Sequence, residues 1–388
     1  MRVGGSRAFT DPFPGGNSQV VMLDPHTGRM VLLAEGRLSS IGLRMVIAAL
    51  LYIPERIVAV IDSTKEQSTT QEAIGFGGDT PIVHSLEEAM KYKPDSMLIG
   101  ITPLGGMLPD SWRAIISEAL NSGLHIISGL KHGLGQDKEF SALASTKGLR
   151  IHDLHHVTKS HQIRAQGSWR RRNINTILTV GTDSNTGKMT TALKVYEEMR
   201  RRDMNVAMIG TGPTGILISG RGVSIEDIPS DFLTGAMEFE IDKAANEGYE
   251  YAIVEGQGAL SNCGNSPIAL GLLHGAMPDA MILCHQPSRE SDGYGLPLPT
   301  IEDSIALHER IIGVFKQANV TAIGLNSMDL NKEDYRLTTK KLQQQTGLLA
   351  VDAMREPATS LVDTLLEYFS KYKKVVLPHD ISEIHDRI

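Results

Sequence analysis

The sequence predicts an α/β protein in which two domains follow each other, each built around a parallel sheet. Apolar, β-branched stretches alternate with helix-forming stretches along almost the whole chain, a pattern typical of strands joined by crossover helices. A polar segment at 152–172, rich in histidine and arginine, divides this alternation into two runs. Directly after it, at 176–191, an apolar stretch leads through a glycine-containing loop into a further helix-forming stretch.

The first run predicts a Rossmann-like domain at 29–155, preceded by a Gly- and Pro-rich lead-in at 1–28. The second expected strand ends at Asp62, where dinucleotide-binding folds place an acid that binds a ribose. The Gly-x-Gly-x-x-Gly fingerprint is absent, so we expect a Rossmann-like domain without a nicotinamide cofactor and keep nicotinamide binding as the alternative. The expected strands are 30–34, 56–61, 80–83, 96–101, 125–128 and 150–152, and the expected helices are 41–51, 86–92, 111–122 and 138–146.

Two glycine-containing loops follow the fourth and fifth of these strands. Gly105 and Gly106 lie in ITPLGG, and 129–134 reads GLKHGL. Loops at the carboxyl ends of parallel strands line the crevice where ligands bind, although a tight turn is the slightly favoured interpretation of each loop taken alone. The linker that we expect at 156–174 belongs to the histidine-rich segment. Its spacing matches no standard zinc pattern, so a polar connector is expected rather than a metal site.

The stretch at 176–191 reads TILTVGTDSNTGKMTT and carries the strongest functional signal. A strand, a loop and a helix N-terminus, in this order, arrange backbone N–H groups around an anion. The spacing is Gly-x5-Gly-Lys, one residue longer than the common Gly-x4-Gly-Lys form. We therefore expect phosphate binding in a P-loop NTPase-like parallel-sheet domain at 175–388, with a plain strand–turn–helix as the alternative. The expected cofactor-binding residues are Gly181, Thr182, Asp183, Ser184, Asn185, Thr186, Gly187, Lys188, Met189, Thr190 and Thr191.

The rest of the second run continues the same alternation. Further strands are expected at 205–209, 250–254, 280–284, 320–325 and 349–351, and helices at 188–202, 304–318, 332–346 and 358–369. The segment at 220–240 starts polar and becomes helical.

Met189 directly follows the loop lysine, where nucleotide hydrolases carry the Ser or Thr that holds Mg²⁺. Either Thr190 takes that role, or the loop holds phosphates without a catalytic magnesium ion. Lys188 supplies a point charge for the outer phosphates in both cases.

Glu255 follows the buried strand YAIV and precedes Gly-Gln-Gly. An acid at the end of such a strand faces the phosphates, where it can accept a proton, orient a nucleophile or bind Mg²⁺. Capping of the next helix is the alternative. Gly256 and Gly258 allow a substrate to approach the backbone closely, so we expect them to contact the substrate.

Three further side chains follow strands of this domain. Arg289 can clamp a substrate carboxylate, or it is a surface arginine. Asp231, together with Asp227 and Glu238, can hold an amine, or the three form a solvated face. Asn326 begins NSMD, which loosely resembles the Asn-x-x-Asp that reads guanine, but the usual lysine is missing. We nevertheless expect Asn326 to contact the cofactor. The alternative is that the match to Asn-x-x-Asp arose by chance.

Composition excludes several classes of partner. The formal net charge of the 388 residues is −7, so binding to nucleic acid or an anionic membrane is not expected. The longest apolar run, 45–53, is too short to span a membrane, and the lead-in has no apolar block of an export signal. The two cysteines give no disulfide framework. We expect a cytoplasmic homo-oligomer with small-molecule partners, namely an amino acid and a phosphate-bearing cofactor.

The second domain resembles dethiobiotin synthetase in GTDSNTGK and VEGQGAL. This resemblance implies ATP, Mg²⁺ and activation of a carboxylate. Met189 stands where that family has its loop threonine.

A second resemblance spans the chain from about residue 30. GITPLGG, SGLKHGL, GTDSNTGKMTTAL, GTGPTGILISG, DFLTGAMEFE and VEGQGAL, in this order, are similar to a family long described as of unknown function that includes D-glutamate N-acetyltransferases. GKMTTAL is that family's own loop. The resemblance implies acetyl transfer from acetyl-CoA, as co-substrate, to the amine of D-glutamate or a related amino acid.

Acyl transfer needs a deprotonated amine, a base and donors for the developing oxyanion. Glu255 is the expected base, Lys188 and the loop hold the coenzyme phosphates, and Arg289 holds the carboxylate of the amino acid. Loop N–H groups, or the amides around 256–258, are the expected oxyanion donors. Two alternatives stay open: an ATP- and Mg²⁺-dependent ligase or kinase of the dethiobiotin synthetase type, and a nucleotide-binding protein without turnover.

Overall fold

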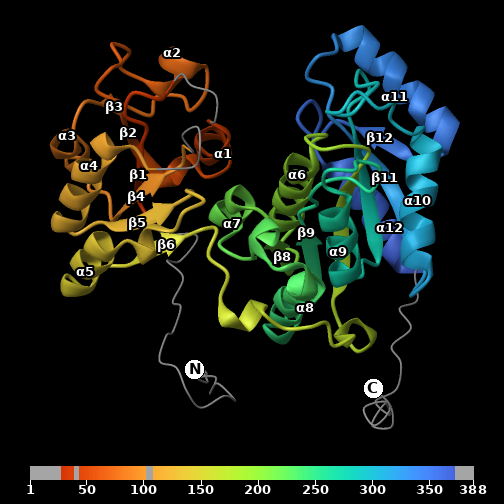
Figure 1. Ribbon diagram of the computed structural model, residues 1–388. Coiled ribbons are helices and arrows are strands. Elements are labelled where there is room, and N and C mark those ends of the chain that lie inside the picture. The colour runs from red at the N-terminus through yellow and green to blue at the C-terminus, as the bar shows by residue number, and fades with distance from the viewer. Residues whose placement is uncertain (1–27, 39–42, 102–107, 372–388) are drawn as a thin grey trace, which may run out of the picture.

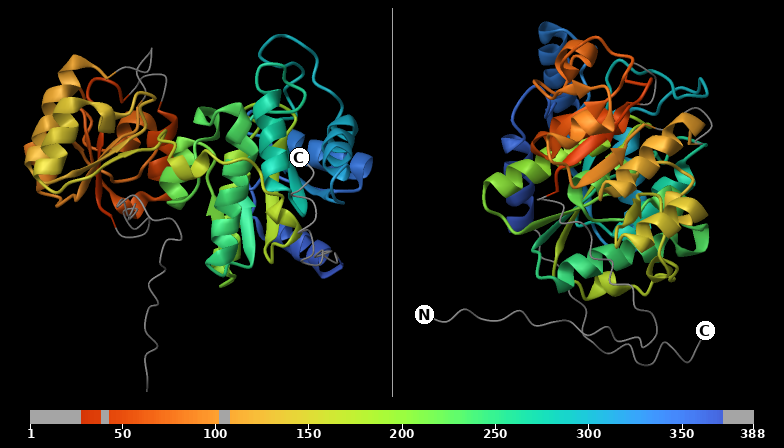
Figure 2. Two further views of the ribbon diagram at one scale, coloured as in Figure 1. Left: turned by 60° about the horizontal axis from the view of Figure 1, so that its bottom comes forward. Right: turned by 90° about the vertical axis from the view of Figure 1, so that its left-hand side faces the viewer.

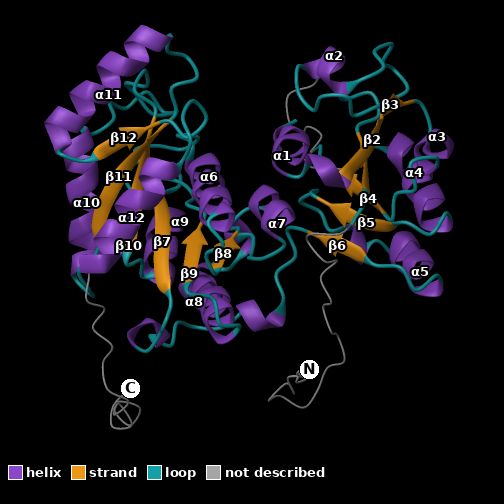
Figure 3. Cartoon of the chain, turned by 180° about the vertical axis from the view of Figure 1, so that it is seen from behind, coloured by secondary structure: helices purple, strands orange, loops and turns teal. Residues whose placement is uncertain are grey.

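Two parallel sheets organise the chain, one in each half (Figure 1). The computed structural model describes residues 28–38, 43–101 and 108–371. The expected lead-in, apart from Gly28, and the loop containing Gly105 and Gly106 lie outside these residues. Helices cover both faces of each sheet (Figure 3). The predicted fold class, a Rossmann-like domain followed by a P-loop domain, is confirmed.

The N-terminal sheet has six strands in the order β3-β2-β1-β4-β5-β6, the order of dinucleotide-binding Rossmann folds. Its central strands are apolar and buried at every position because helices pack on both faces. The strands are β1 (Met30–Leu33), β2 (Ile57–Ile61), β3 (Ile82–Val83), β4 (Ser96–Ile99), β5 (His125–Ser128) and β6 (Ile151–Asp153). The helices are α1 (Arg44–Tyr52), α2 (Thr70–Ile74), α3 (Leu86–Met90), α4 (Asp110–Asn121) and α5 (Lys138–Thr146).

Asp62, at the end of β2, binds the neighbouring backbone. Its Oδ1 accepts the N–H of Gly36 at 3.0 Å, and its Oδ2 accepts the N–H of Leu38 at 3.1 Å. Thr64 donates both its N–H and its hydroxyl to Oδ1. The side chain is completely buried. Its oxygens are therefore engaged within the protein, which favours the reading without a nicotinamide cofactor.

The connector between the sheets lies against α8 (Ser230–Asn246) and contains two 3-10 turns, Lys159–His161 and Ser168–Arg170. The buried Glu238 of α8 accepts the N–H groups of Gln166 and Ser168. At Gly235 an added Cβ would lie 2.1 Å from the carbonyl oxygen of Ile163. The connector is thus packed against the second domain and is not a free linker between the two sheets.

The C-terminal sheet has six strands in the order β12-β11-β10-β7-β9-β8. The chain leaves β7 toward β8 and β9 on one side, and leaves β10 toward β11 and β12 on the other. The crevice at the carboxyl ends of β7 and β10 is therefore the switch point at which α/β folds bind ligands. The strands are β7 (Asn175–Gly181), β8 (Val206–Ile209), β9 (Tyr251–Val254), β10 (Ala280–His285), β11 (Asn319–Leu325) and β12 (Leu349–Val351). Besides α8, the helices are α6 (Lys188–Arg201), α7 (Pro213–Ser219), α9 (Ser266–Ala276), α10 (Ile301–Gly313), α11 (Lys332–Thr346) and α12 (Thr359–Lys371).

One apolar cluster crosses the boundary between the two halves. It includes the core of the N-terminal sheet, Leu193 of α6, and Leu217 and Ile218 of α7. Helix α1 packs against α7, which lies between the two halves (Figure 2). A second cluster fills the other face of the C-terminal sheet, beneath α8, α9 and α10. Continuous apolar burial therefore joins the two domains directly.

Two helices of the second domain differ from the expectation. The GTGPTG segment, expected as a loop after β8, begins α7 with Pro213 at its first turn. Helix α9 was not predicted, because Gly271 and Gly275 weaken its helix propensity. These glycines are required by packing: added Cβ atoms would lie 2.3 Å from a Leu233 methyl and 2.7 Å from Met237 Cβ of α8. Within the described ranges, every helix is too short or too polar to cross a lipid bilayer.

We predict that Asp62→Asn lowers the free energy of unfolding at pH 7 by about 1–3 kcal/mol, because buried donors lose their acceptor. Burial raises the pKa of Asp62, but hydrogen bonds from Thr64, Gly36 and Leu38 outweigh it, so the pKa is lowered overall. The carboxylate therefore stabilises the fold above its unfolded pKa of about 3.9, and this contribution is lost as the pH falls through the folded value.

Urea unfolding at pH 7 and at pH 3 measures this effect. The exposed Asp79→Asn is the control, with an expected change below about 0.5 kcal/mol. Equal stability of the two variants at pH 7 would contradict the role assigned to Asp62.

Candidate functional site

The phosphate loop lies at the switch point, between the end of β7 and the start of α6. Gly187 adopts a φ of +98°, and no side chain caps the helix. The first helical hydrogen bond runs from Thr191 N–H to Gly187 O, so the N–H groups of Lys188, Met189 and Thr190 have no acceptor within the helix. An uncapped helix N-terminus at this edge of the sheet is suited to an anion.

Lys188 turns back into its own loop. Its Nζ donates to the carbonyl oxygen of Asp183 at 2.7 Å and lies 3.5 Å from Thr186 Oγ1. The side chain is buried, and burial lowers the pKa of the ammonium to about 8. An added Cβ at Gly181 would lie 2.8 Å from Nζ, so only glycine fits at the end of β7.

Side chains from two neighbouring loops hold the phosphate loop. Asn262 donates to Asp183 Oδ1 at 2.8 Å, and Arg289 donates to Asp183 Oδ2 at 2.9 Å and to the carbonyl oxygen of Ser184. Asn265 donates to Ser184 Oγ at 2.6 Å. Burial raises the pKa of Asp183, but these and backbone hydrogen bonds outweigh it, and the pKa is lowered. Arg289 therefore lies at the loop, bound to protein oxygens.

Glu255 is buried at the end of β9, where its Oε2 accepts the N–H of Thr211 at 2.9 Å. Burial raises the pKa of this carboxyl to about 7, although the N–H groups of Thr211 and Gly212 and the nearby charge of Lys188 oppose the increase. The start of α7 approaches closely, since an added Cβ at Gly215 would lie 2.0 Å from Oε2. The acid expected from the sequence thus lies beside the loop lysine, with both pKa values close to neutral.

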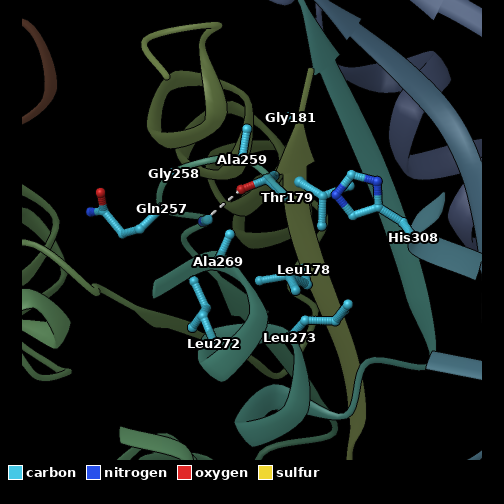
Figure 4. A pocket seen from close by; sticks show the side chains of 12 residues that line it. Leu178, Thr179, Gly181, Gln257, Gly258, Ala259, Ala269, Leu272, Leu273 and His308 are labelled. Atoms are coloured by element: carbon cyan, nitrogen blue, oxygen red, sulfur yellow. Dashed lines mark hydrogen bonds between the residues drawn. The ribbon is translucent and has the colours of Figure 1, made fainter. Parts of the chain in front are cut away.

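Gly256 and Gly258 belong to a tight turn beside β7. Gly256 donates its N–H to Thr179 Oγ1 at 2.9 Å, and an added Cβ would lie 3.0 Å from Lys188 Cδ. Its amide is therefore engaged, and the close approach that it permits is to β7 and the lysine stem rather than to a substrate. Gly258 has a φ of +63°. Both glycines line a small cavity of about 10 Å³, which has room for about one water molecule. Figure 4 shows Gly258 at this cavity together with Leu272 and His308.

The residues after Lys188 face the N-terminal domain. Met189 is partly buried against the apolar cluster that joins the domains. The hydroxyl of Thr190 hydrogen-bonds the Tyr52 hydroxyl of α1. Thr191 hydrogen-bonds the buried thiol of Cys284. The side chain of Thr190 therefore contacts the other domain at the start of α6.

Asn326 reaches the loop from β11. Its Nδ2 lies 3.5 Å from the carbonyl oxygen of Asn185, and its Cβ lies 3.4 Å from the position of a Cβ added at Gly187. Asp329, at the end of NSMD, instead accepts hydrogen bonds from Gln286 and Ser288. Asn326 is thus brought to the expected cofactor site, while Asp329 joins two neighbouring loops.

The acids after β8 lie apart from this group. Asp231 is exposed in the first turn of α8, and its side chain has no hydrogen bond or ion pair with another described residue. Asp227 pairs with His155 at 2.6 Å, and His161 pairs with Glu240 at 2.9 Å. Among residues 28–38, 43–101 and 108–371, no group of three or more His, Cys, Asp or Glu side chains is arranged to hold a metal ion.

Several residues of the site were not predicted from the sequence. Asn262 and Asn265 lie in a Ser/Asn-rich turn, whose polar composition next to Gly-Gln-Gly is the signal that could have indicated them. Arg44 and Tyr52 lie on α1 of the other domain and carry no motif. Their contacts arise only from the packing of the domains.

Residues 163–362 match the DUF1611 P-loop domain, and residues 63–157 match the DUF1611_N Rossmann-like domain; both are described as domains of unknown function. The chain belongs to the DUF1611 family. A DUF1611 protein of known crystal structure from Anabaena variabilis is 29% identical, with a TM-score of 0.79 over 88% of this chain and 100% of that one. The similarity therefore covers both domains.

Two curated relatives of this chain are named D-glutamate N-acetyltransferase. The protein from Tritonibacter scottomollicae is 34% identical over 288 residues, which are 72% of this chain and 84% of the relative. The protein from a Pseudoalteromonas species is 35% identical over 288 residues, with the same coverage.

We predict that Gly215→Ala lowers the free energy of unfolding by about 1–3 kcal/mol, because its methyl group would overlap the buried Glu255 carboxylate. Gly313→Ala, at the end of α10, is the matched control, since nothing lies within 4 Å of an added Cβ there. Urea unfolding of both variants measures the difference. If Gly215→Ala is as stable as Gly313→Ala, Glu255 does not occupy this position.

Proposed function

We propose that this protein is an N-acetyltransferase that transfers acetyl from acetyl-CoA to the amine of D-glutamate or a related amino acid. The observation that carries the proposal is the pairing of a buried lysine and a buried glutamate at the phosphate loop, Lys188 with a pKa of about 8 and Glu255 with a pKa of about 7. Strongly perturbed titratable groups of opposite charge in a ligand crevice indicate a catalytic site. The printed names of the two relatives support the choice of reaction.

The loop suits the phosphates of coenzyme A. Uncapped N–H groups at the start of α6 and the Lys188 ammonium supply positive charge, and Gly181 and Gly187 leave the backbone uncovered. Met189 is packed in apolar surroundings, and Thr190 is paired with Tyr52. Met189 places no hydroxyl directly after the loop lysine, and acetyl transfer from a thioester needs no magnesium ion.

Glu255 is the proposed base. It takes a proton from the amine of the amino acid, whose nitrogen then attacks the thioester carbonyl carbon. The C–N bond forms as the C–S bond breaks, and coenzyme A leaves as a thiol after accepting a proton. The products are the N-acetyl amino acid and free coenzyme A. N–H groups of the loop are the proposed oxyanion donors, because the amide of Gly256 is engaged by Thr179.

Arg289 is the proposed partner of the amino-acid carboxylate. Its guanidinium is partly exposed, and its Nη1 binds Asp183 and the carbonyl oxygen of Ser184. A guanidinium has further donors that can bind a carboxylate in pairs. The contact with Asp183 would orient it at the edge of the loop. Gly258 remains a proposed substrate contact, and Asn326 a proposed cofactor contact.

The wider proposal is a cytoplasmic homo-oligomer whose partners are small molecules, without a nucleic-acid or membrane partner. The net charge of −7 supports the part of this proposal that concerns nucleic acid and anionic membranes.

We predict that Glu255→Gln lowers kcat by about 10²–10⁴-fold, the usual contribution of a general base. In the wild type, kcat/KM should rise with pH through about 7 as Glu255 loses its proton, and fall above about 8 as Lys188 loses its charge. Acetyl transfer to D-glutamate, followed by release of the free thiol across this pH range, measures both limbs. A Glu255→Gln enzyme that keeps the wild-type rate and the lower limb would overturn the assignment of the base.

We predict that Arg289→Gln raises KM for the amino acid by about 10–100-fold, because a charge-assisted hydrogen bond is lost. KM for acetyl-CoA should change less. Steady-state kinetics with each substrate varied in turn separates the two effects. A larger change in KM for acetyl-CoA would place Arg289 at the phosphates instead.

Calorimetric titration with acetyl-CoA and with Mg-ATP tests the reaction class. We expect binding of acetyl-CoA. Tight binding of Mg-ATP with no response to acetyl-CoA would replace the proposal with a ligase or kinase, and binding without product from a panel of amino acids would indicate a protein without turnover.

A further inference from the structure

Arg44 of the N-terminal domain reaches the phosphate loop of the C-terminal domain. Its Nη1 donates to Asn185 Oδ1 at 3.2 Å. Both residues are exposed, and Asn185 lies at the rim of the loop with a φ of +58°. Within the described part of the chain, the Arg44 side chain has no other hydrogen-bond or ion-pair partner.

Helix α1 places Arg44 beside the rim of the phosphate loop. At the other end of α1, the Tyr52 ring lies 5.2 Å from Lys194 Nζ, and its hydroxyl contacts Thr190 of α6. Arg44 thus lies beside the residues before α6, and Tyr52 lies beside the first and second turns of α6. Helix α1 packs against α7 at the contact between the domains and reaches α6 through Tyr52, so the domain contact itself brings the guanidinium to the loop.

The three cationic side chains at the loop differ in the groups that they bind. Lys188 binds the carbonyl oxygen of Asp183, and Arg289 binds the carboxylate of the same residue. Arg44 contacts only a neutral amide, which offsets none of its charge. A guanidinium with donors to spare, at the mouth of an anion-binding loop, is suited to a phosphate oxygen.

We propose that Arg44 is a phosphate ligand supplied by the Rossmann-like domain, so that a phosphate-bearing co-substrate bridges the two domains. The identity of that co-substrate as coenzyme A rests on the proposed function, whereas the phosphate contact does not. The Rossmann-like domain thereby forms part of the catalytic site, although its own acid Asp62 is engaged within the fold.

The test is calorimetric titration of the full chain with coenzyme A and, separately, with inorganic pyrophosphate. Arg44→Gln should weaken the binding of each by about 10–100-fold and reduce the salt dependence of binding. Arg44→Lys should recover part of the loss. Arg336→Gln, an exposed arginine on α11, makes the same change in net charge away from the loop and should bind as the wild type does. If Arg44→Gln binds both ligands as Arg336→Gln does, the inference fails.

A double-mutant comparison separates a phosphate contact from a purely structural one. Asn185→Gly keeps the left-handed backbone and removes the amide that Arg44 contacts. If Arg44 acts on phosphate directly, Arg44→Gln still weakens binding by about tenfold in the Asn185→Gly background. If Arg44 only holds Asn185, the second substitution has no further effect, and the inference is wrong.

Hydrogen exchange gives a readout specific to the bridge. Coenzyme A should slow amide exchange in α1 of the wild type, and much less in Arg44→Gln at equal saturation. Unchanged exchange in the wild type would contradict bridging. Failure of the wild type to bind coenzyme A while it still binds pyrophosphate would overturn the proposed function alone, because the pyrophosphate measurement tests Arg44 independently.

Discussion

The burial of one ammonium group, that of Lys188, determines much of the C-terminal domain. Removing such a charge from water costs several kcal/mol unless polar groups replace the water. Here the carbonyl oxygen of Asp183, the hydroxyl of Thr186 and the nearby carboxyl of Glu255 do so. The same burial excludes side chains at Gly181 and Gly256, whose added Cβ atoms would lie 2.8 Å and 3.0 Å from the lysine. Gly181 and Gly256, which belong to motifs far apart in the sequence, are therefore both required by the packing around Lys188.

The loop is held from several sides, which keeps its backbone open without a ligand. Asn262 and Asn265 follow β9, Arg289 follows β10, and Asn326 follows β11. All of them arrive at one edge because the strands are parallel and the loop lies at the switch point. An anion site assembled in this way needs little reorganisation on binding, which is the arrangement that electrostatic catalysis requires.

Much of the fold could be predicted from the sequence because periodicity and strand composition are local. Helix α11 and strand β12 lie as expected, and the loop was recognised from its spacing and flanking elements. Helix α9 was missed because its glycines are required by close packing against α8. Such tertiary contacts cannot be read from the local sequence pattern. The bonds of Asn262 and Arg289 to Asp183 were missed for the same reason, because they arise from tertiary packing, and Asn262 carried no motif. Asp231 was grouped with the site by sequence proximity, which the exposed start of α8 does not support.

The first turn of α6 contacts both the proposed anion site and the other domain, so binding and domain docking are linked thermodynamically. Its backbone N–H groups lie at the proposed anion site, while the partly buried side chains of Met189 and Thr190 contact the other domain. The first turn of α6 therefore takes part both in the proposed anion binding and in the contact between the domains. Linkage requires the effect to be reciprocal: occupancy of the loop must shift the docking equilibrium of the domains by the same free energy with which docking shifts affinity. The surface that joins the two domains would then act as an allosteric input to the proposed binding site.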